Sequence, residues 1–479
     1  MGLLIKRTIF VFTFTFNFIF CQQNKGQIFG SVIDRLSGYP LQGANISISD
    51  SDLGTISDDD GRFFINNIEQ GYYTLVVSFI GFETVTLPDI WVRPKAYDLI
   101  TVRMNQKTIQ LDGIIVEDSY FSGSELNQEQ SIVFRNDEIR RAPGAAQELS
   151  RILNSLPSVA SVGENRQDLM VRGGGPTENG FIVDNIHLPN ISHFGMEDGR
   201  SNGPIGMINT ELIDNIEFYS NGFPAKYGGR LSSFGEINYR NGNQNSLEGN
   251  LSMGIGGAGL LLEGPLSENS TFISSYRRSY LDVIAALINA GGLPSYDDLQ
   301  AKITYKPNHY NILTFLTVNG SSLYQRKEDI AIEDELSQFG QRKNKQNTFG
   351  FNYKRIWNKK SFSNTSISYT QQITDAKFIE LDDRSVSSSI KNSLLTIYLR
   401  NANQIKINES TSLEFGYESR LKKADYDFFL NDLSISQNIQ IKNNYSFFTL
   451  KQILSERFFL SGGFRLSQNS FESETLLSP

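Results

Sequence analysis

The chain has 479 residues, more than one compact core usually holds, so we expect two or three domains. Its 52 acidic and 44 basic residues give a net charge of −8, which argues against a nucleic-acid partner. Aromatic residues make up 12% and there are 40 glycines, a combination that suits strands and tight turns better than helix bundles. The sequence has no internal apolar stretch of about 18 residues, which excludes a bundle of membrane-spanning helices but leaves a β-barrel open.

Residues 1–21 are predicted to be a signal peptide. Lys6 and Arg7 supply a positive start, and residues 8–20 supply the apolar core. Cys21 follows as the only cysteine of the chain, which excludes a disulfide framework and every multi-cysteine metal site. Lipidation of Cys21 is the alternative, although that processing favours a small residue where the chain has Phe20.

Residues 26–105 are expected to form a small β-sandwich, because short alternating stretches are separated by turn residues. In its turn glycines and in the string Asp60-Gly61-Arg62-Phe63, this segment resembles the carboxypeptidase-regulatory-like domain, a sandwich of the transthyretin type. The acidic run at residues 58–60 is interpreted as a hairpin turn. A calcium site is the alternative, but the spacing of an EF-hand is absent.

Residues 106–129 combine a short apolar segment with a polar, loop-like stretch. The apolar segment consists of Leu111, Asp112, Gly113, Ile114, Ile115, Val116 and Glu117. Such a segment beside a flexible linker is suited to adding to the sheet edge of another protein through main-chain hydrogen bonds. An ordinary first strand of the next domain explains the same residues equally well, so both interpretations stay open.

Residues 130–245 are expected to form a compact α+β domain. Within it, residues 147–156 predict an amphipathic helix that ends at Pro157. Three blocks follow in order, and their key residues are Arg172, Gly173 and Gly174, then Asp184, then Glu217, Gly222, Tyr227 and Gly228. These blocks resemble the plug domain of a TonB-dependent outer-membrane receptor. The ending at residues 230–233 resembles the branch of that family that carries the sandwich domain in front.

One residue departs from the family pattern, since Asn185 stands where the family usually has Gly. Asn tolerates a left-handed turn nearly as well, so the predicted fold is unchanged. Two glycine-rich stretches imitate nucleotide-binding motifs. Residues 173–175 lack the Lys-Ser/Thr of a P-loop, and residues 254–259 lead to Pro265 rather than to a helix, so a hairpin tip explains them better.

Residues 246–479 alternate between apolar and polar with a period of two, as the lipid and lumen faces of a barrel require. Phe349 and Phe351, for example, alternate with Gly350 and Asn352. We expect about eleven strands, with short turns on one side and longer polar loops near residues 281–298, 321–346, 377–392 and 424–438 on the other. A soluble β-sandwich is the alternative. An open sheet of this size has two unpaired edges, so we expect the chain to be the front half of a receptor.

The expected fold class is therefore mainly β, with a sandwich, an α+β plug and part of a transmembrane antiparallel barrel. The resemblance implies a receptor in the outer membrane of a Gram-negative cell, surrounded by outer-membrane lipid, that takes a scarce solute into the periplasm. It further implies the TonB carboxy-terminal domain as a partner at residues 111–117. The solute stays open among a siderophore, an oligosaccharide, a peptide and a metal chelate. A secreted or surface adhesin is the alternative function.

No catalytic residue, cofactor or resident metal is expected, because no hydrolase or metalloprotease motif accompanies the three histidines. Groups that bind the solute are expected in residues 187–200, which show neither strand nor helix periodicity and should form a loop. The candidate ligand-binding residues are His187, His193, Glu197, Asp198 and Arg200. For His193, packing against the core of the domain is the favoured alternative.

Overall fold

The computed structural model describes most of the chain between residues 25 and 478. The residues left out within that range are 36, 50, 52, 93–98, 106–130, 143–147, 162–165, 197–199, 202–204, 221, 255–256, 281–293, 334, 359, 409, 431–432, 456–457 and 471–474. The predicted signal peptide and residues 111–117 therefore lie outside the described residues. Within the described ranges, no helix is long and apolar enough to cross a membrane.

The first domain, residues 25–105, is a two-layered β-sandwich. One sheet has the strand order β4-β1-β7 and the other β3-β2-β5-β6. Its strands are β1 (Gly26–Asp34), β2 (Asn45–Ile48), β3 (Gly54–Ile56), β4 (Arg62–Ile68), β5 (Gly71–Ser78), β6 (Val85–Val92) and β7 (Leu99–Met104). Alternation sets the core: Phe63 and Ile65 on β4 are buried, whereas Phe64 between them is exposed.

The middle domain, residues 131–247, is built around a five-stranded sheet with the order β12-β11-β14-β13-β8. Its sheet strands are β8 (Ser131–Arg135), β11 (Asn179–Val183), β12 (Ile186–Leu188), β13 (Ile213–Tyr219) and β14 (Ser233–Tyr239). A separate hairpin and short helices complete it: β9 (Val159–Ser161), β10 (Leu169–Val171), α1 (Asn136–Arg141), α2 (Leu149–Leu153), η2 (Pro176–Glu178) and η3 (Thr210–Leu212).

Two expectations for the middle domain need correction. The helix predicted at residues 147–156 is shorter in the structure than expected. Helix α2 spans only Leu149–Leu153, and the turn after it leads into Pro157. His187 was expected in an irregular loop but lies in strand β12, where Ile182 on β11 is its partner in the antiparallel register. Three residues are too few to give a recognisable strand period in the sequence.

The large sheet contains twelve described strands in sequence order, each pairing antiparallel with its neighbours, against about eleven expected. The strands are β15 (Glu248–Gly254), β16 (Gly257–Ser267), β17 (Ser270–Arg278), β18 (Ser295–Asn308), β19 (Asn311–Arg326), β20 (Gln338–Asn358), β21 (Ser361–Glu380), β22 (Val386–Asn408), β23 (Thr411–Leu430), β24 (Leu433–Ser455), β25 (Phe458–Asn469) and β26 (Thr475–Ser478). Helix α4 (Glu328–Glu333) stands between β19 and β20. The described chain is thus mainly β, as predicted.

The strands are longer than expected, and two of the four predicted long loops are wrong; residues 281–293 of a third lie outside the described residues. Strands β20 to β24 each contain 20 to 23 residues, and they extend through most of the loops expected near residues 377–392 and 424–438. A strand needs only about ten residues to cross a bilayer, so these strands are long enough to continue well beyond one. Their outer parts contain many charged, amide and hydroxyl residues, which is why the sequence resembled loops.

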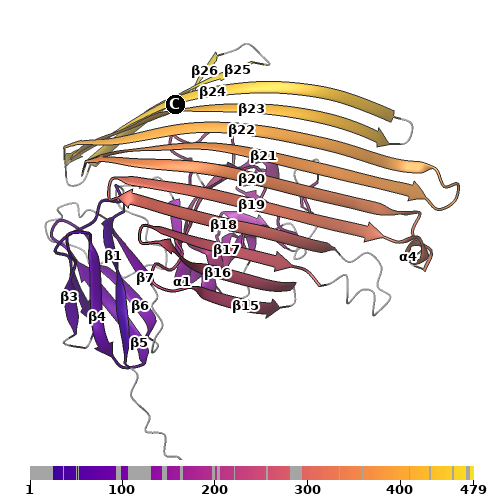
Figure 1. Ribbon diagram of the computed structural model, residues 1–479. Helices are drawn as coiled ribbons and strands as arrows, with labels where there is room; N and C mark the ends of the chain where they lie inside the picture. Colours follow the sequence, from indigo (N-terminus) through magenta and orange to yellow (C-terminus); the bar gives the residue numbers. More distant parts are fainter. Residues whose placement is uncertain are drawn as a thin grey trace, which may run out of the picture.

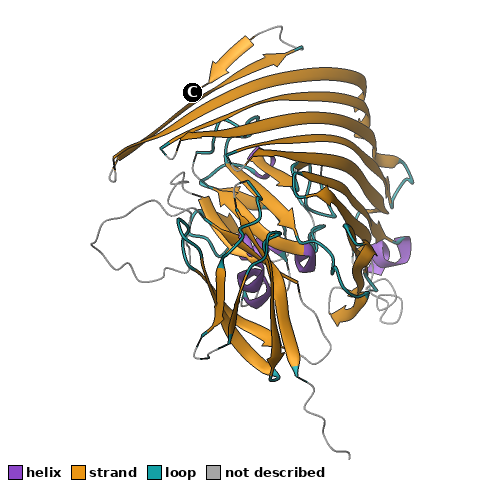
Figure 2. Ribbon diagram, turned by 60° about the vertical axis from the view of Figure 1, so that its left-hand side comes forward, coloured by secondary structure: helices purple, strands orange, loops and turns teal. Residues whose placement is uncertain are grey.

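The sheet has one apolar and one polar face. On β20, Phe349 and Phe351 are exposed, whereas Thr348 and Asn352 are buried on the other face, where Asn352 contacts Asn185 of the middle domain. The sheet is curved, and the middle domain lies on its concave side (Figures 1 and 2). The core of the middle domain continues into that concave face, because Leu316 and Val318 of β19 belong to the same buried cluster.

The first domain lies at the end of the sheet that carries the short turns (Figure 1). His309, in the turn between β18 and β19, contacts Asp60 of the first domain. Helix α4 lies at the opposite end (Figure 1). One end of the sheet thus carries the first domain and the other carries α4. The sequence predicted two unlike ends from the unequal lengths of the connections, although the observed connections are shorter than the predicted loops.

Candidate ligand-binding site

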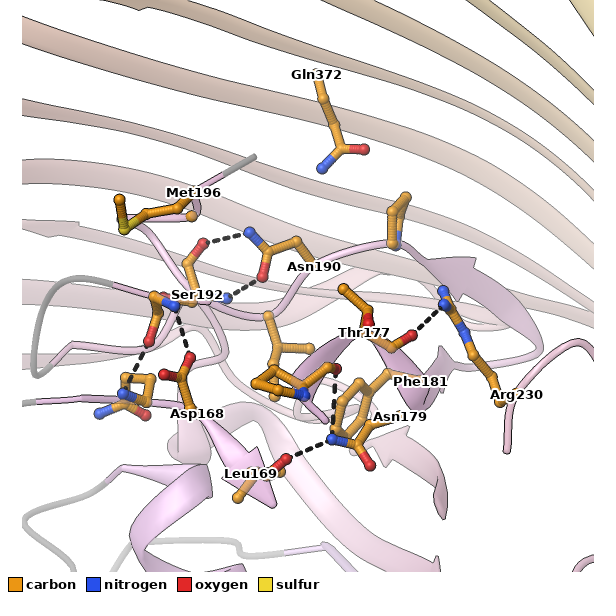
Figure 3. Close-up of a pocket in the computed structure, with 16 residues that line it drawn as sticks. Asp168, Leu169, Thr177, Asn179, Phe181, Asn190, Ser192, Met196, Arg230 and Gln372 are labelled. Atoms are coloured by element: carbon orange, nitrogen blue, oxygen red, sulfur yellow. Dashed lines mark hydrogen bonds between the residues drawn. The ribbon is translucent and has the colours of Figure 1, made fainter. Parts of the chain in front are cut away.

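A cavity of about 190 Å³ lies between the middle domain and the concave face of the large sheet. The residues that Figure 3 labels around it are Asp168, Leu169, Thr177, Asn179, Phe181, Asn190, Ser192, Met196, Arg230 and Gln372. All but Gln372 come from the middle domain. The lining is rich in amides and hydroxyls, so the site suits a polar group better than an apolar one.

Two parts of the lining are fixed by hydrogen bonds that leave little freedom. Asn179 donates from Nδ2 to the carbonyl of Leu169 at 2.6 Å and accepts from Ser233 Oγ at 2.7 Å. Asn190 accepts from the backbone N–H of Ser192 at 2.9 Å and donates to its carbonyl at 3.1 Å, as Figure 3 shows. The second arrangement is a local turn closed by the Asn side chain, which shapes the wall of the cavity.

Three polar atoms of the lining have no hydrogen-bond partner within the described part of the chain, and one of them, Asp168 Oδ2, is ion-paired with Arg166. The other two are Ser192 Oγ and Arg230 Nε, and both are buried. The guanidinium of Arg230 is held in place by a bond of 2.7 Å from NH1 to the carbonyl of Thr177. Buried polar groups are nearly always paired, so Ser192 Oγ and Arg230 Nε are the lining atoms with unused hydrogen-bonding capacity.

His187, on the strand that precedes the lining residues Pro189 and Asn190, lies near several positive charges. Burial lowers the pKa of His187 well below its usual value, and the nearby charges of Arg420 and Arg230 lower it further. His187 therefore stays neutral, with its ring 5.4 Å from that of Tyr398. The lining itself has one charged residue of each sign, Arg230 and Asp168, so it suits a polar ligand.

The segment that forms one wall of the cavity is bonded to the large sheet, near the end of the sheet that is opposite the short turns. His193 Nε2 lies 2.9 Å from Asp298 Oδ2, and Ser322 Oγ donates to the carbonyl of His193 at 2.5 Å. Asp298 is near the start of β18, whereas the short turn follows its other end, Asn308. The cavity thus belongs to the side opposite the first domain.

A buried ionic network supports this anchor. Arg277 binds Asp298 through Nε at 3.0 Å and also donates to the carbonyls of Gly206 and Met207. Glu148 accepts the backbone N–H of Gly206 at 2.7 Å. Burial raises the pKa of Glu148 to about 7, although the positive charge of Arg277 works against that rise.

A second anchor lies at the left-handed turn after β11. Asp184 and Asn185 have φ values of 47° and 66°. Lys302 Nζ lies 3.0 Å from Asp184 Oδ1 and donates to the carbonyl of Tyr239 at 2.6 Å. Burial raises the pKa of Asp184, and the ammonium of Lys302 opposes that rise. This turn therefore ties two strands of the middle domain to β18.

The other key residues of the predicted plug blocks shape the domain rather than the cavity. Arg172 and Gly173 have positive φ values of 50° and 83°, as does Gly222 at 57°. Tyr227 is buried and stacked on Phe234 with ring centroids 4.1 Å apart. The remaining three serve close contacts: Gly174 faces Ser232, Gly228 faces Arg465 of β25, and Glu217 accepts from Tyr219 at 2.8 Å.

The predicted ligand-binding residues are only partly placed. His187 and His193 are buried and do not line the cavity, whereas Arg200 is exposed. Glu197 and Asp198 lie outside the described residues, as do Leu111, Ile114, Ile115, Val116 and Glu117. His187 contacts Tyr398 and His193 contacts Asp298, and the role of the charged residues stays a proposal.

Sequence reasoning missed the lining residues themselves. Asn190 and Ser192 lie within the segment that was singled out, and their Asn-x-Ser spacing is a turn signal that could have found them. Asp168 opens a recognised block, where its carboxylate accepts the backbone N–H of Ser201 at 2.6 Å. Gln372 carries no local signal, because only the fold brings β21 over the cavity.

Comparison with known families identifies both smaller domains. The CarboxypepD_reg-like domain matches residues 28–116, and the TonB-dependent receptor plug domain matches residues 124–233. Both resemblances seen in the sequence are thereby confirmed. A search of curated proteins returns no match.

Solved structures with a similar fold are outer-membrane and siderophore receptors. A mutant ferric enterobactin receptor of Pseudomonas aeruginosa is 15% identical over 74% of this chain and 59% of its own, with a TM-score of 0.55. The siderophore receptor PirA of Acinetobacter baumannii is 14% identical, over 76% and 60%, with a TM-score of 0.54. FauA of Bordetella pertussis, the alcaligin outer-membrane receptor, is 12% identical, over 73% and 56%, with a TM-score of 0.51. The chain thus spans less than two thirds of each receptor, and the likeness is one of fold.

Proposed function

We propose that this chain, with its TonB-dependent receptor plug domain seated against a curved antiparallel sheet, is an outer-membrane receptor that takes up a polar solute. The plug is the middle domain described above, and the sheet is part of the barrel wall. The solute binds on the side of the plug opposite the first domain and passes into the periplasm when the TonB complex pulls on the plug.

The observation that carries this proposal is the two-faced character of the sheet around the plug. Apolar side chains such as Phe349, Phe351 and Ile367 cover the convex face, whereas Asn352, Ser366 and Arg400 on the concave face bind the plug. A soluble sheet would not expose a band of large apolar residues to water. Lipid on one side and a plug on the other explain both faces.

The sidedness of the cavity supports a receptor open to the outside. Short turns face the periplasm in outer-membrane barrels, and the cavity lies toward the opposite end of the sheet. The orphaned Ser192 Oγ and Arg230 Nε offer a hydroxyl and a guanidinium N–H to a ligand. These groups suit hydroxyl, carbonyl or anionic oxygen atoms, which siderophores, oligosaccharides, peptides and metal chelates all carry.

The proposed periplasmic partner is the TonB carboxy-terminal domain, which would bind residues 111–117 by strand addition. The domains and the fold are those of transport receptors rather than of known enzymes. The comparisons lend no support to the alternative of a surface adhesin.

Fractionation of cell envelopes that contain the full chain tests the membrane assignment. The chain is expected in the outer-membrane fraction, and it should stay there after washing at high pH, because an apolar convex face holds it in lipid rather than at a charged surface. Recovery in the culture medium, or release by the wash, would favour the adhesin.

A further inference from the structure

The first domain contacts the plug and the barrel wall at the same time. Arg103 on β7 forms an ion pair with Asp214 on β13 of the plug, and Asp60 contacts His309 in the turn between β18 and β19. We propose that the first domain is a clamp that holds the plug seated, so that the plug moves only after this domain has undocked. This inference rests on the proposed function only in treating the plug as the moving part.

The plug side of the clamp centres on one carboxylate. Asp214 pairs with Arg103, and Asn215 Nδ2 also donates to Asp214 Oδ2 at 2.7 Å. Beside this pair, burial lowers the pKa of Arg35, while the carboxylates of Glu217 and Asp214 act in the opposite direction. Arg35 and Arg103 of the first domain thus lie near Glu217 and Asp214 of strand β13, while Arg135 of β8 adds an opposing positive charge.

The barrel side of the clamp uses the turn after β1 and the turn before β4. His309 Nε2 lies 2.8 Å from Asp60 Oδ1, and the rings of Tyr39 and Tyr310 are 6.4 Å apart. A Cβ atom at Gly38 would lie 3.3 Å from Lys354 Nζ on β20. The turn is stiff, because Asp34 bonds to both Gly38 and Tyr39 through the backbone at 2.8 Å.

Rigidity makes these separate contacts act as one clamp. The first domain has its own buried core, which includes Val32 and Val102, so its two contact sites keep a fixed spacing. Strand β13 pairs with β14 on one side and with the edge strand β8 on the other. A shift of β13 relative to the turn at His309 must therefore break the contact at Asp214 or the one at Asp60. Each pair is partly exposed and so individually weak, which suits a reversible contact.

A charge swap with a distant reporter tests the clamp in the full chain in outer-membrane vesicles. A reporter with Tyr39→Cys and Tyr310→Cys measures docking by cross-linking with a bis-maleimide. Variants that carry only one of these two substitutions control for cross-links to Cys21. The parent reporter should cross-link. Adding Asp214→Arg, which opposes Arg103, should lower the yield about fivefold. Combining Asp214→Arg with Arg103→Asp restores an opposite pair and should restore the yield.

The rescue separates loss of docking from loss of folding. Equal yields with and without Asp214→Arg, no cross-link in the parent reporter, or a charge swap that stays as low as the single reversal would each overturn the clamp. These outcomes leave the proposed function standing as long as the chain is in the outer membrane. Failure of the proposed function would appear differently, as absence of the parent chain from that membrane.

Discussion

Arg400 of barrel strand β22 donates a hydrogen bond of 2.8 Å to the side-chain oxygen of Asn185 in the plug. Asn185 Nδ2 also donates to Asn352 Oδ1 at 3.2 Å, and Ser366 Oγ donates to its carbonyl at 2.8 Å. Asn185 therefore bonds to three strands of the wall from a left-handed turn where the family usually has Gly. Asn in place of the usual Gly keeps the backbone turn and also adds a contact between the plug and the barrel.

Asn185→Gly should lower the stability of the folded chain in detergent by about 1–3 kcal/mol, because it keeps the turn but leaves buried partners unsatisfied. The matched control is Asn67→Gly, since Asn67 also has a positive φ, 69°, but is exposed in the first domain. Thermal unfolding of both variants measures the difference. Equal small effects would show that Asn185 contributes only its backbone conformation.

Gly350→Val should also weaken the packing of the plug against strand β20. A Cβ atom at Gly350 would lie 2.2 Å from Ile186 Cδ1 and 2.7 Å from its Cγ1, so the buried Ile186 must move at a cost of about 1–3 kcal/mol. Gly462→Val is the control, because a Cβ atom on that glycine of β25 meets no heavy atom within 4 Å. Proteolysis of the plug in intact vesicles should accelerate only for the first variant. A similar rate in both would mean that the plug does not press on β20.

Glu148 should make stability depend on pH. Its pKa rises from 4.5 to about 7 on folding, so the folded state binds more protons between those values and stability falls as the pH rises through them. Glu148→Gln removes this proton uptake while keeping an acceptor for the N–H of Gly206. The variant should match the parent near about pH 5 and exceed its stability by up to about 3 kcal/mol near about pH 8.

The difference in melting temperature between parent and variant isolates Glu148, because the other titrating groups are common to both. A difference that stays constant from acid to mildly basic conditions would contradict the assignment. It would mean that Arg277 compensates the carboxylate fully at every pH.

The cavity and the charged loop beside it make separate predictions for binding. The double substitution Ser192→Ala and Arg230→Gln removes the hydroxyl and the guanidinium that we expect to hydrogen-bond to the solute. Solute affinity should therefore fall about tenfold. The triple substitution Glu197→Ala, Asp198→Ala and Arg200→Ala tests the loop. A ferric siderophore and an oligosaccharide serve as probes in titrations of the full-length protein. Loss of affinity only in the triple variant would move the binding site from the cavity to the loop.

The sequence predicts the parts of this fold that depend on local pattern. The alternation of Phe349 and Phe351 with Gly350 and Asn352 indicates a two-faced strand, and the structure places those faces as expected. The prediction fails where charged and amide residues are interspersed with apolar ones near the ends of strands, as in residues 424–430 of β23 and 433–438 of β24. Pairing rather than side-chain pattern decides the conformation there, since each residue is bonded to a neighbouring strand.

The contacts of the plug could not be predicted, because they join distant parts of the chain. The tolerance of Asn185 for a left-handed turn follows from its chemistry, but its partner Arg400 is 215 residues away. The same holds for Gln372 over the cavity and for Arg103 against Asp214. A pattern within one window of sequence carries no information on which strands will face each other.

The measurement that tests the central claim most directly is solute uptake by cells that carry Ile115→Pro in the full-length protein. Proline removes the backbone donor that strand addition to TonB requires, so uptake should be abolished while solute binding at the cell surface is unchanged. Ile115→Leu keeps that donor and an apolar side chain, and it should transport like the parent. Normal uptake by the Ile115→Pro variant would contradict a receptor driven through residues 111–117.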